Sequence, residues 1–172
     1  AYRISLERRL DERGFFARSY CSDEFSAMGL VTDWVQSNIS YNKLKGTLRG
    51  LHYQVAPHAE AKLVRCLHGA IFDVLVDLRA GSPSFGRWTA LTLSDDNRDT
   101  AYLPAGFAHG FQTLTDDAEV QYFHSQRYVP VADRGVSHAD PVLAIAWPLL
   151  PVNVSARDLA FPNLSAIEPV QT

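Results

Sequence analysis

The chain has 172 residues, of which 47% are hydrophobic and 20% charged, a balance typical of globular proteins rather than of disordered or fibrous chains. Sixteen Lys and Arg against 19 Asp and Glu leave a net charge of −3, and no basic run occurs, so we expect no nucleic-acid partner. No apolar stretch reaches the roughly 18 residues needed to cross a bilayer, so no membrane span is expected either.

The length favours one domain over residues 1–172, because no repeat, low-complexity segment or linker divides the chain. The first ten residues alternate charge with apolarity and lack the apolar core of a secretory signal. The two cysteines, Cys21 and Cys66, form neither a CxxC pair nor a disulfide-dense pattern. Two free thiols in a reducing cytoplasm are therefore the simplest interpretation.

In chain order, residues 22–28 predict a helix of one or two turns, and the rest of the chain reads mainly as strands. Between residues 62 and 78 apolar side chains recur at even positions while the odd positions include Arg65, Asp73 and Asp77, which indicates one mostly apolar face. Further strands are predicted, from aromatic and β-branched content, at residues 49–54, 88–93, 100–103, 110–114 and 119–125. Residues 155–159 predict a short capped turn.

This pattern predicts an all-β protein of about six to eight antiparallel strands with few short helices. A sandwich or jelly-roll barrel hides strand edges within one domain of this size, and its mouth can hold a ligand. Polar residues on the inward face of such strands are therefore the candidates for chemistry.

The segment Gly46-Thr-Leu-Arg-Gly-Leu-His-Tyr-Gln54 places Arg49 and His52 three residues apart in a strand that otherwise looks buried. An inward Arg49 requires an anion, either a core carboxylate or a substrate phosphate. His52 is either a structural histidine or a base. Lys62 shares the parity of its strand's apolar residues, so it either snorkels out at the strand end or stabilises negative charge on a substrate oxygen.

His109 lies in Leu103-Pro-Ala-Gly-Phe-Ala-His-Gly-Phe111, which is similar to the second half of the metal-binding cupin pattern. The first half requires two histidines separated by one residue, whereas His52 is followed by Gln54, and His58 and Glu60 have the wrong spacing. The sequence therefore disfavours a metal site and leaves His109 as either a packed or a ligand-facing residue.

Tyr122, His124 and Tyr128 share one parity in a strand, and a tyrosine hydroxyl on an inner wall needs a hydrogen-bond partner. Either tyrosine is a core aromatic, or a phenol serves as an acid facing His52 across a cavity. Asp158, near the C-terminus, offers a carboxylate that could fold back to orient a histidine.

Taken together, these motifs resemble the dTDP-4-dehydrorhamnose 3,5-epimerase family of cupin-like sugar-nucleotide epimerases. The resemblance covers nearly the whole chain in the family's order and spacing. The matching segments are residues 11–16, 35–38, 46–54, 62–66, 72–79, 82–86, 104–111, 122–128, 140–141, 147–148 and 155–158. It implies a cupin-type jelly-roll barrel that inverts C3 and C5 of a nucleotide-linked 4-keto-6-deoxyhexose with no metal or organic cofactor.

The resemblance also implies roles for individual residues. His52 corresponds to the family's catalytic base, held by Asp158, Lys62 to the residue that stabilises the enolate oxygen, and Tyr122 to the acid on the opposite face. The substrate-binding positions that it implies are Arg13, Phe16, Gln36, Asn38, Arg49, His109, Tyr128 and Asp133. It further implies a homodimer in which the N-terminal segment around Arg13 and Phe16 reaches the neighbour's site.

Two positions depart from the family pattern. Arg18 stands where a Glu is usual near the nucleotide base, and Asp133 stands where Glu is commoner. A guanidinium in place of a carboxylate reverses the hydrogen bonding at the base, so dTDP, CDP and GDP all remain open, unless Arg18 simply faces solvent.

Other functions remain alternatives at this point. An epimerase acting at C3 alone or C5 alone needs the same residues, because regiochemistry depends on the shape of the pocket. A 3,4-ketoisomerase is disfavoured by the combination of Lys62 and Tyr122, and a metal-dependent cupin oxygenase by the missing histidine pair. A sugar-binding module needs no acid, base and electrophile together.

Overall fold

The computed structural model describes all 172 residues, and strands dominate it. The strands are β1 (Tyr2–Ile4), β2 (Arg9–Asp11), β3 (Gly14–Phe16), β4 (Gln36–Asn42), β5 (Leu48–Gln54), β6 (Lys62–His68), β7 (Ala70–Asp77), β8 (Trp88–Ser94), β9 (Thr100–Leu103), β10 (Phe107–Thr113), β11 (Ala118–His124) and β12 (Asp133–Gly135). The helical elements are α1 (Ser22–Ala27), α2 (Ala156–Leu159) and the single 3-10 turn Leu164–Ala166. No helix is both long and apolar enough to cross a bilayer.

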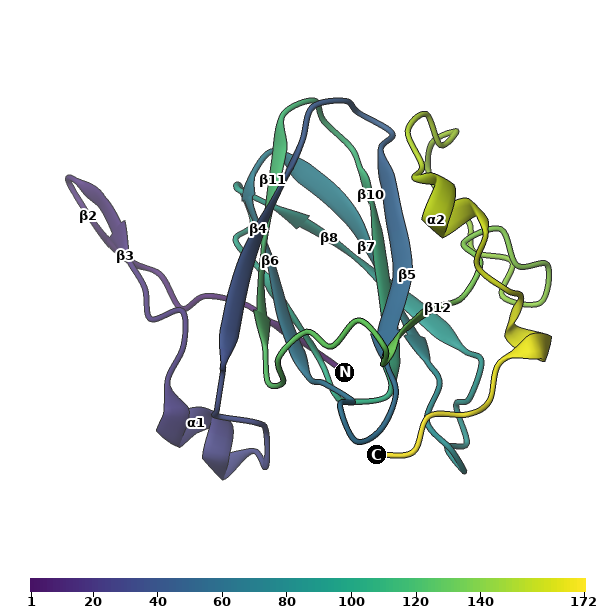
Figure 1. Ribbon diagram of the computed structural model, residues 1–172. Coiled ribbons are helices and arrows are strands. Elements are labelled where there is room, and N and C mark those ends of the chain that lie inside the picture. The colour runs from purple at the N-terminus through teal and green to yellow at the C-terminus, as the bar shows by residue number, and fades with distance from the viewer.

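Two five-stranded antiparallel sheets face each other and form a barrel (Figure 1). The first has the order β1-β9-β6-β11-β4 and the second β12-β5-β10-β7-β8. Apolar side chains from both sheets fill one end of the space between them, including Val64, Leu75, Phe111 and Val120. This arrangement confirms the predicted all-β jelly-roll fold.

The chain that follows β12 covers the outer face of the second sheet. Figure 1 shows α2 and the segments around it lying beside β5 and β12. Leu51, Val74 and Val76 point outward from this sheet and pack against Val136 and Leu164. Burial on both faces explains why β7 is almost continuously apolar in sequence.

The even-position apolar face predicted across residues 62–78 is wrong beyond residue 68. Gly69, with φ of 73°, turns the chain between β6 and β7, so the two halves belong to different sheets and their parities are unrelated. Asp73, expected on the polar face, points into the barrel and is fully buried. A positive φ is accessible to glycine without steric cost, which explains the turn at this position.

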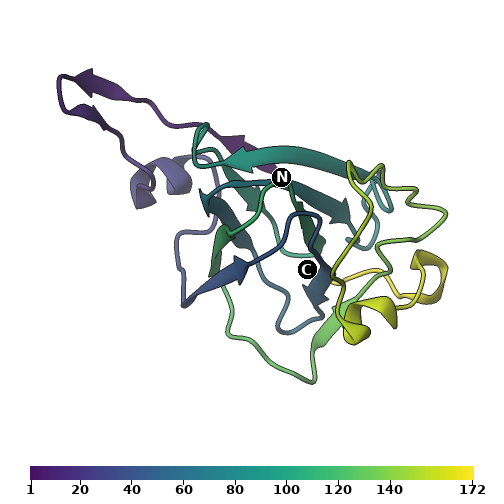
Figure 2. The same ribbon diagram turned by 90° about the horizontal axis from the view of Figure 1, so that it is seen from above.

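The predicted strands 49–54, 88–93, 100–103, 110–114 and 119–125 all form, with boundaries shifted by at most three residues. The short strands β1, β2, β3 and β12 and the longer β4 were not predicted, because they carry little apolar alternation. The hairpin of β2 and β3 projects away from the barrel (Figures 1 and 2), and all six of its strand residues are exposed.

Candidate active site

A cavity of about 310 Å³ lies between the two sheets, and polar side chains dominate its wall. The lining residues are Asn38, Ile39, Ser40, Arg49, His52, Tyr53, Gln54, Glu60, Lys62, His109, Gly110, Phe111, Tyr122, His124, Tyr128, Asp133 and Arg157. Eight of the residues singled out from the sequence for catalysis or binding line this cavity. The concentration of titratable groups in one concave site marks it as the candidate active site.

His52 and Asp158 form a hydrogen-bonded pair at this cavity. His52 Nε2 lies 2.9 Å from Asp158 Oδ1, and the backbone N–H of Gly50 donates to Asp158 Oδ2 at 2.9 Å. Ser155 Oγ accepts from the N–H of Asp158, and this N-cap fixes the start of α2. Burial alone raises the pKa of Asp158, but the bonds from His52 and Gly50 hold it below its ordinary value. The ionised carboxylate therefore orients the imidazole of His52.

An extra residue in β5 brings Arg49 and His52 to the same cavity, although a regular strand would place residues three apart on opposite faces. The register pairs His52 with His109 and Arg49 with Phe111, so three steps along β5 match two along β10. Such a bulge re-aims side chains. It forms at Gly50, whose φ is 116° and where a Cβ would lie 2.6 Å from Gly110 Cα.

Tyr122 reaches the cavity from β11 in the sheet opposite His52. Burial raises the pKa of its phenol well above its ordinary value, so the hydroxyl stays protonated. Its ring meets that of His109 edge-on, with centroids 5.8 Å apart. The buried His109 in turn pairs with Asp73 at 2.6 Å, forming a second His–Asp contact. The sequence did not predict Asp73 at the site, because the turn at Gly69 hid its inward orientation.

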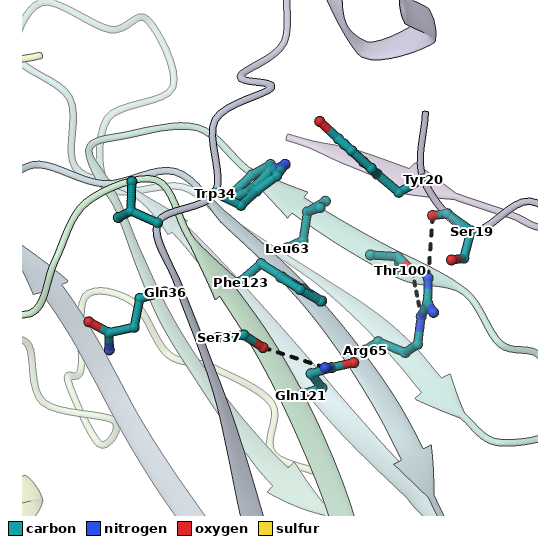
Figure 3. Close-up of a pocket in the computed structure, with 11 residues that line it drawn as sticks. Ser19, Tyr20, Trp34, Gln36, Ser37, Leu63, Arg65, Thr100, Gln121 and Phe123 are labelled. Carbon is teal, nitrogen blue, oxygen red and sulfur yellow. Dashed lines mark hydrogen bonds between the residues drawn. The ribbon is translucent and has the colours of Figure 1, made fainter. Parts of the chain in front are cut away.

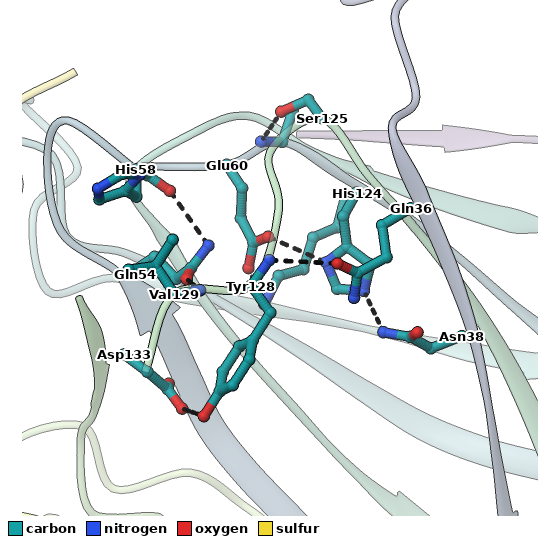
Figure 4. A network of polar contacts seen from close by, with 12 residues as sticks. Gln36, Asn38, Gln54, His58, Glu60, His124, Ser125, Tyr128, Val129 and Asp133 are labelled. Carbon is teal, nitrogen blue, oxygen red and sulfur yellow. Dashed lines mark hydrogen bonds and ion pairs between the residues drawn. The ribbon is translucent and has the colours of Figure 1, made fainter. Parts of the chain in front are cut away.

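Lys62 is buried and its ammonium lies 3.1 Å from Glu60 Oε1. Glu60 Oε2 accepts from His124 Nδ1 at 3.0 Å, so one carboxylate contacts two cavity residues (Figure 4). Burial by itself raises the pKa of Glu60, but His124 and Lys62 together lower it below its ordinary value. Glu60 was not predicted as a site residue, although it lies two residues before Lys62, a spacing that in extended chain favours the same face.

The mouth of the cavity carries two guanidinium groups. Arg49 Nε donates to Asn42 at 2.6 Å, and Arg157 pairs with Asp133 at 2.5 Å. Tyr128, on the same rim, donates its hydroxyl to Asp133 at 2.9 Å (Figure 4). Arg157 was not predicted as a site residue. Two arginines at one opening suit a phosphate-bearing ligand, since guanidinium groups bind phosphate through paired N–H donors.

Three predicted binding residues lie outside this cavity. Gln36 accepts a hydrogen bond from the N–H of Tyr128 at 3.2 Å but lines a different pocket. Arg13 and Phe16 stand on the projecting hairpin, where Arg13 pairs with Asp11. Arg18, the departure from the family pattern, is exposed and pairs with Glu24 at 2.8 Å.

A larger cavity, of about 470 Å³, lies on the outer face of the first sheet (Figure 3). Tyr20, Trp34 and Phe123 give it aromatic walls, and Arg65 binds Thr100 within it. It contains no acid–base pair, so the chemistry belongs to the inner cavity. No group of three or more His, Cys, Asp or Glu side chains is arranged to hold a metal ion.

The two-sheet barrel with an acid–base site between its sheets defines a cupin-type jelly-roll enzyme. A sequence profile of the family described as dTDP-4-dehydrorhamnose 3,5-epimerase matches residues 1–166. The chain belongs to this family, and it is an isomerase.

Several characterised proteins are similar to the chain over most of its length. It is 47% identical to the dTDP-4-dehydrorhamnose 3,5-epimerase of Escherichia coli K12, over 84% of the chain and 80% of that protein. It is 41% identical to a dTDP-4-dehydrorhamnose 3-epimerase of Streptomyces niveus, over 91% of the chain and 76% of that protein. A Legionella pneumophila dTDP-6-deoxy-D-glucose-3,5-epimerase, solved with dTDP-4-keto-L-rhamnose, superimposes with a TM-score of 0.89 and 41% identity, covering 96% of the chain and 88% of that structure.

Proposed function

We propose that this protein inverts C3 and C5 of a dTDP-linked 4-keto-6-deoxyhexose by removing a proton on one face and returning one on the other. The observation that carries the proposal is the cavity itself. A histidine oriented by a carboxylate and a protonated phenol line it from opposite sheets, and a buried lysine lies beside them. The Legionella relative in complex with dTDP-4-keto-L-rhamnose supports this substrate class.

The chemistry requires these residue types. A C–H next to a ketone is weakly acidic, so its removal needs a positioned base and charge stabilisation at the oxygen that becomes an enolate. His52 accepts the proton, and Asp158 stabilises the imidazolium that results. The Lys62 ammonium meets the negative charge on O4. Tyr122 delivers a proton to the opposite face of the carbon, which inverts its configuration.

Heavy water tests the base. We expect wild-type protein to add solvent deuterium to the sugar of a dTDP-4-keto-6-deoxyhexose, and His52→Asn to add none, because asparagine cannot accept the proton. Mass spectrometry of the recovered sugar measures the incorporation. His68→Asn is the matched control, since His68 lies on an exposed strand end and is expected to leave incorporation intact. Full incorporation by His52→Asn would exclude His52 as the base.

A single-centre epimerase is the second candidate, because one relative at 41% identity is described as a 3-epimerase. Both functions use the same residues, so substitutions do not distinguish them. The heavy-water experiment does, through the number of deuterium atoms in the product. Two deuterium atoms in the wild-type product indicate inversion at both centres, and one indicates a single centre. Parallel assays of dTDP-, CDP- and GDP-linked sugars identify the nucleotide.

We also infer a homodimer in which the projecting hairpin of each chain completes the partner's site. Leu10 and Phe16 at this hairpin are 80% and 72% exposed, and burying their apolar side chains against a second chain would be favourable. On the same side of the barrel, Ile39 and Tyr41 of the edge strand β4 are also exposed. Arg13, one of the predicted substrate-binding residues, lies on the hairpin and does not line the cavity of its own chain.

A further inference from the structure

Three side chains that line the cavity, Lys62, Glu60 and His124, are linked by polar contacts. Lys62 and His124 are cross-strand partners in β6 and β11, and both point inward. Glu60 precedes Lys62 by two residues and reaches both of them. Its Oε1 lies 3.1 Å from Lys62 Nζ, and its Oε2 lies 3.0 Å from His124 Nδ1. The carboxylate therefore divides its two oxygens between two donors.

The far side of His124 fixes the direction of its bond to Glu60. His124 Nε2 lies 3.3 Å from Asn38 Nδ2, which is a donor, so Nε2 accepts and Nδ1 carries the proton (Figure 4). His124 thus donates to Glu60 through Nδ1. Glu60 is 8% exposed, and the Lys62 ammonium beside it compensates its charge. A buried carboxylate requires such compensation.

We propose that Glu60 is a positioning residue for Lys62 and that His124 controls how Glu60 is shared, an inference that rests on Lys62 meeting the enolate oxygen as proposed above. A lysine ammonium sits on a flexible four-carbon stem, so its place in a site depends on what holds it. One of its three N–H donors is fixed by Glu60, which leaves the other two for the substrate oxygen. His124 occupies the second carboxylate oxygen and prevents the carboxylate from rotating.

Replacing the carboxylate by an amide tests this sharing. A glutamine has one acceptor oxygen where glutamate has two, so in Glu60→Gln the donors of Lys62 and His124 compete for it. Removing the competitor with His124→Ala leaves that oxygen to Lys62. The positioning role therefore predicts that His124→Ala rescues Glu60→Gln, which a purely structural role for either residue does not predict.

The experiment is a double-mutant cycle on kcat, measured by deuterium incorporation into a dTDP-4-keto-6-deoxyhexose. Glu60→Gln is expected to lower kcat about tenfold with KM nearly unchanged, because enolate stabilisation develops only in the transition state. In the His124→Ala background the same substitution is expected to cost less than about threefold. In a Lys62→Met background it is expected to cost nothing further. Glu119→Gln, on the outer face of β11, is the matched control.

The outcomes separate this inference from the proposed function. If Lys62→Met is as active as wild type, the lysine's part in the proposed reaction is wrong. If Lys62→Met is impaired but Glu60→Gln is harmless, or costs the same in every background, the positioning role is wrong and the reaction stands.

A measurement on the wild-type protein tests the same geometry without relying on the folding of a variant. In ¹⁵N NMR spectra of imidazole-labelled protein, with His124 assigned by its loss in His124→Ala, we expect a protonated Nδ1. An unprotonated Nδ1 would show that His124 does not donate to Glu60 and would overturn the sharing.

Discussion

At the scale of single residues, burial and hydrogen bonding shift the pKa values of Tyr122 and Asp158 in opposite directions. Desolvation keeps the Tyr122 phenol protonated by raising its pKa, whereas the bonds from His52 and Gly50 keep Asp158 ionised despite its burial. The Tyr122 phenol thus holds a proton for delivery, and the Asp158 carboxylate orients its neighbour His52.

Tyr122→Phe separates the two half-reactions. Without the phenol the enolate cannot be protonated on the second face, so we expect inversion to slow by about 10²- to 10⁴-fold. His52 still removes and returns a proton, so substrate recovered from heavy water is expected to carry deuterium with unchanged configuration. NMR of the sugar measures both quantities. Tyr41→Phe, on the outer face of β4, is the control, and inversion at the wild-type rate in Tyr122→Phe would contradict the role.

At the scale of elements, the bulge in β5 decides which side chains of that strand reach the cavity. The residues of the motif around Arg49 and His52 were recognisable in the sequence, but their common orientation depends on the pairing of β5 with β10. The same holds for β7, whose parity relative to β6 was set by the turn at Gly69. Alternation within a strand is local, whereas the offset between strands depends on the partner strand.

Gly50→Ala tests the bulge. The new Cβ would lie 2.6 Å from Gly110 Cα and 2.8 Å from the carbonyl oxygen of His109, both backbone atoms that cannot rotate away. We expect the free energy of unfolding to fall by about 3 kcal/mol, measured by denaturant titration. Gly81→Ala is the control: its φ of 71° is also positive, but no atom lies within 4 Å, so about 1 kcal/mol is expected. Equal losses at both positions would contradict the packing argument.

At the scale of the whole molecule, the barrel contains the cavity, whereas the hairpin lies apart from it. The inner cavity lies within one chain, whereas Arg13 and Phe16 lie on a hairpin that extends away from it (Figure 2). If the hairpin completes the partner's site, a substitution in the hairpin impairs the partner's site. A substitution in the cavity impairs the site of its own chain.

Mixed dimers test this arrangement. Arg13→Ala and His52→Asn are each expected to lower kcat/KM strongly. When they are co-expressed, half of the dimers are mixed, and each of these has one site with both residues intact, so about one quarter of the wild-type kcat/KM is expected. Light scattering checks that the mass is twice that of one chain. Activity no higher than the average of the two parents would show that each hairpin serves its own chain.

The sequence by itself determined the all-β class, most of the long strands and the residue types gathered in the cavity, because alternation and motif spacing are properties of neighbouring residues. Only the tertiary structure revealed the contacts of Glu60 with Lys62 and His124, the burial of Asp73 against His109, and the separation of the hairpin from the cavity. Glu60 and His124 are 64 residues apart. Their meeting depends on the register of β6 against β11, which no pattern within either strand specifies.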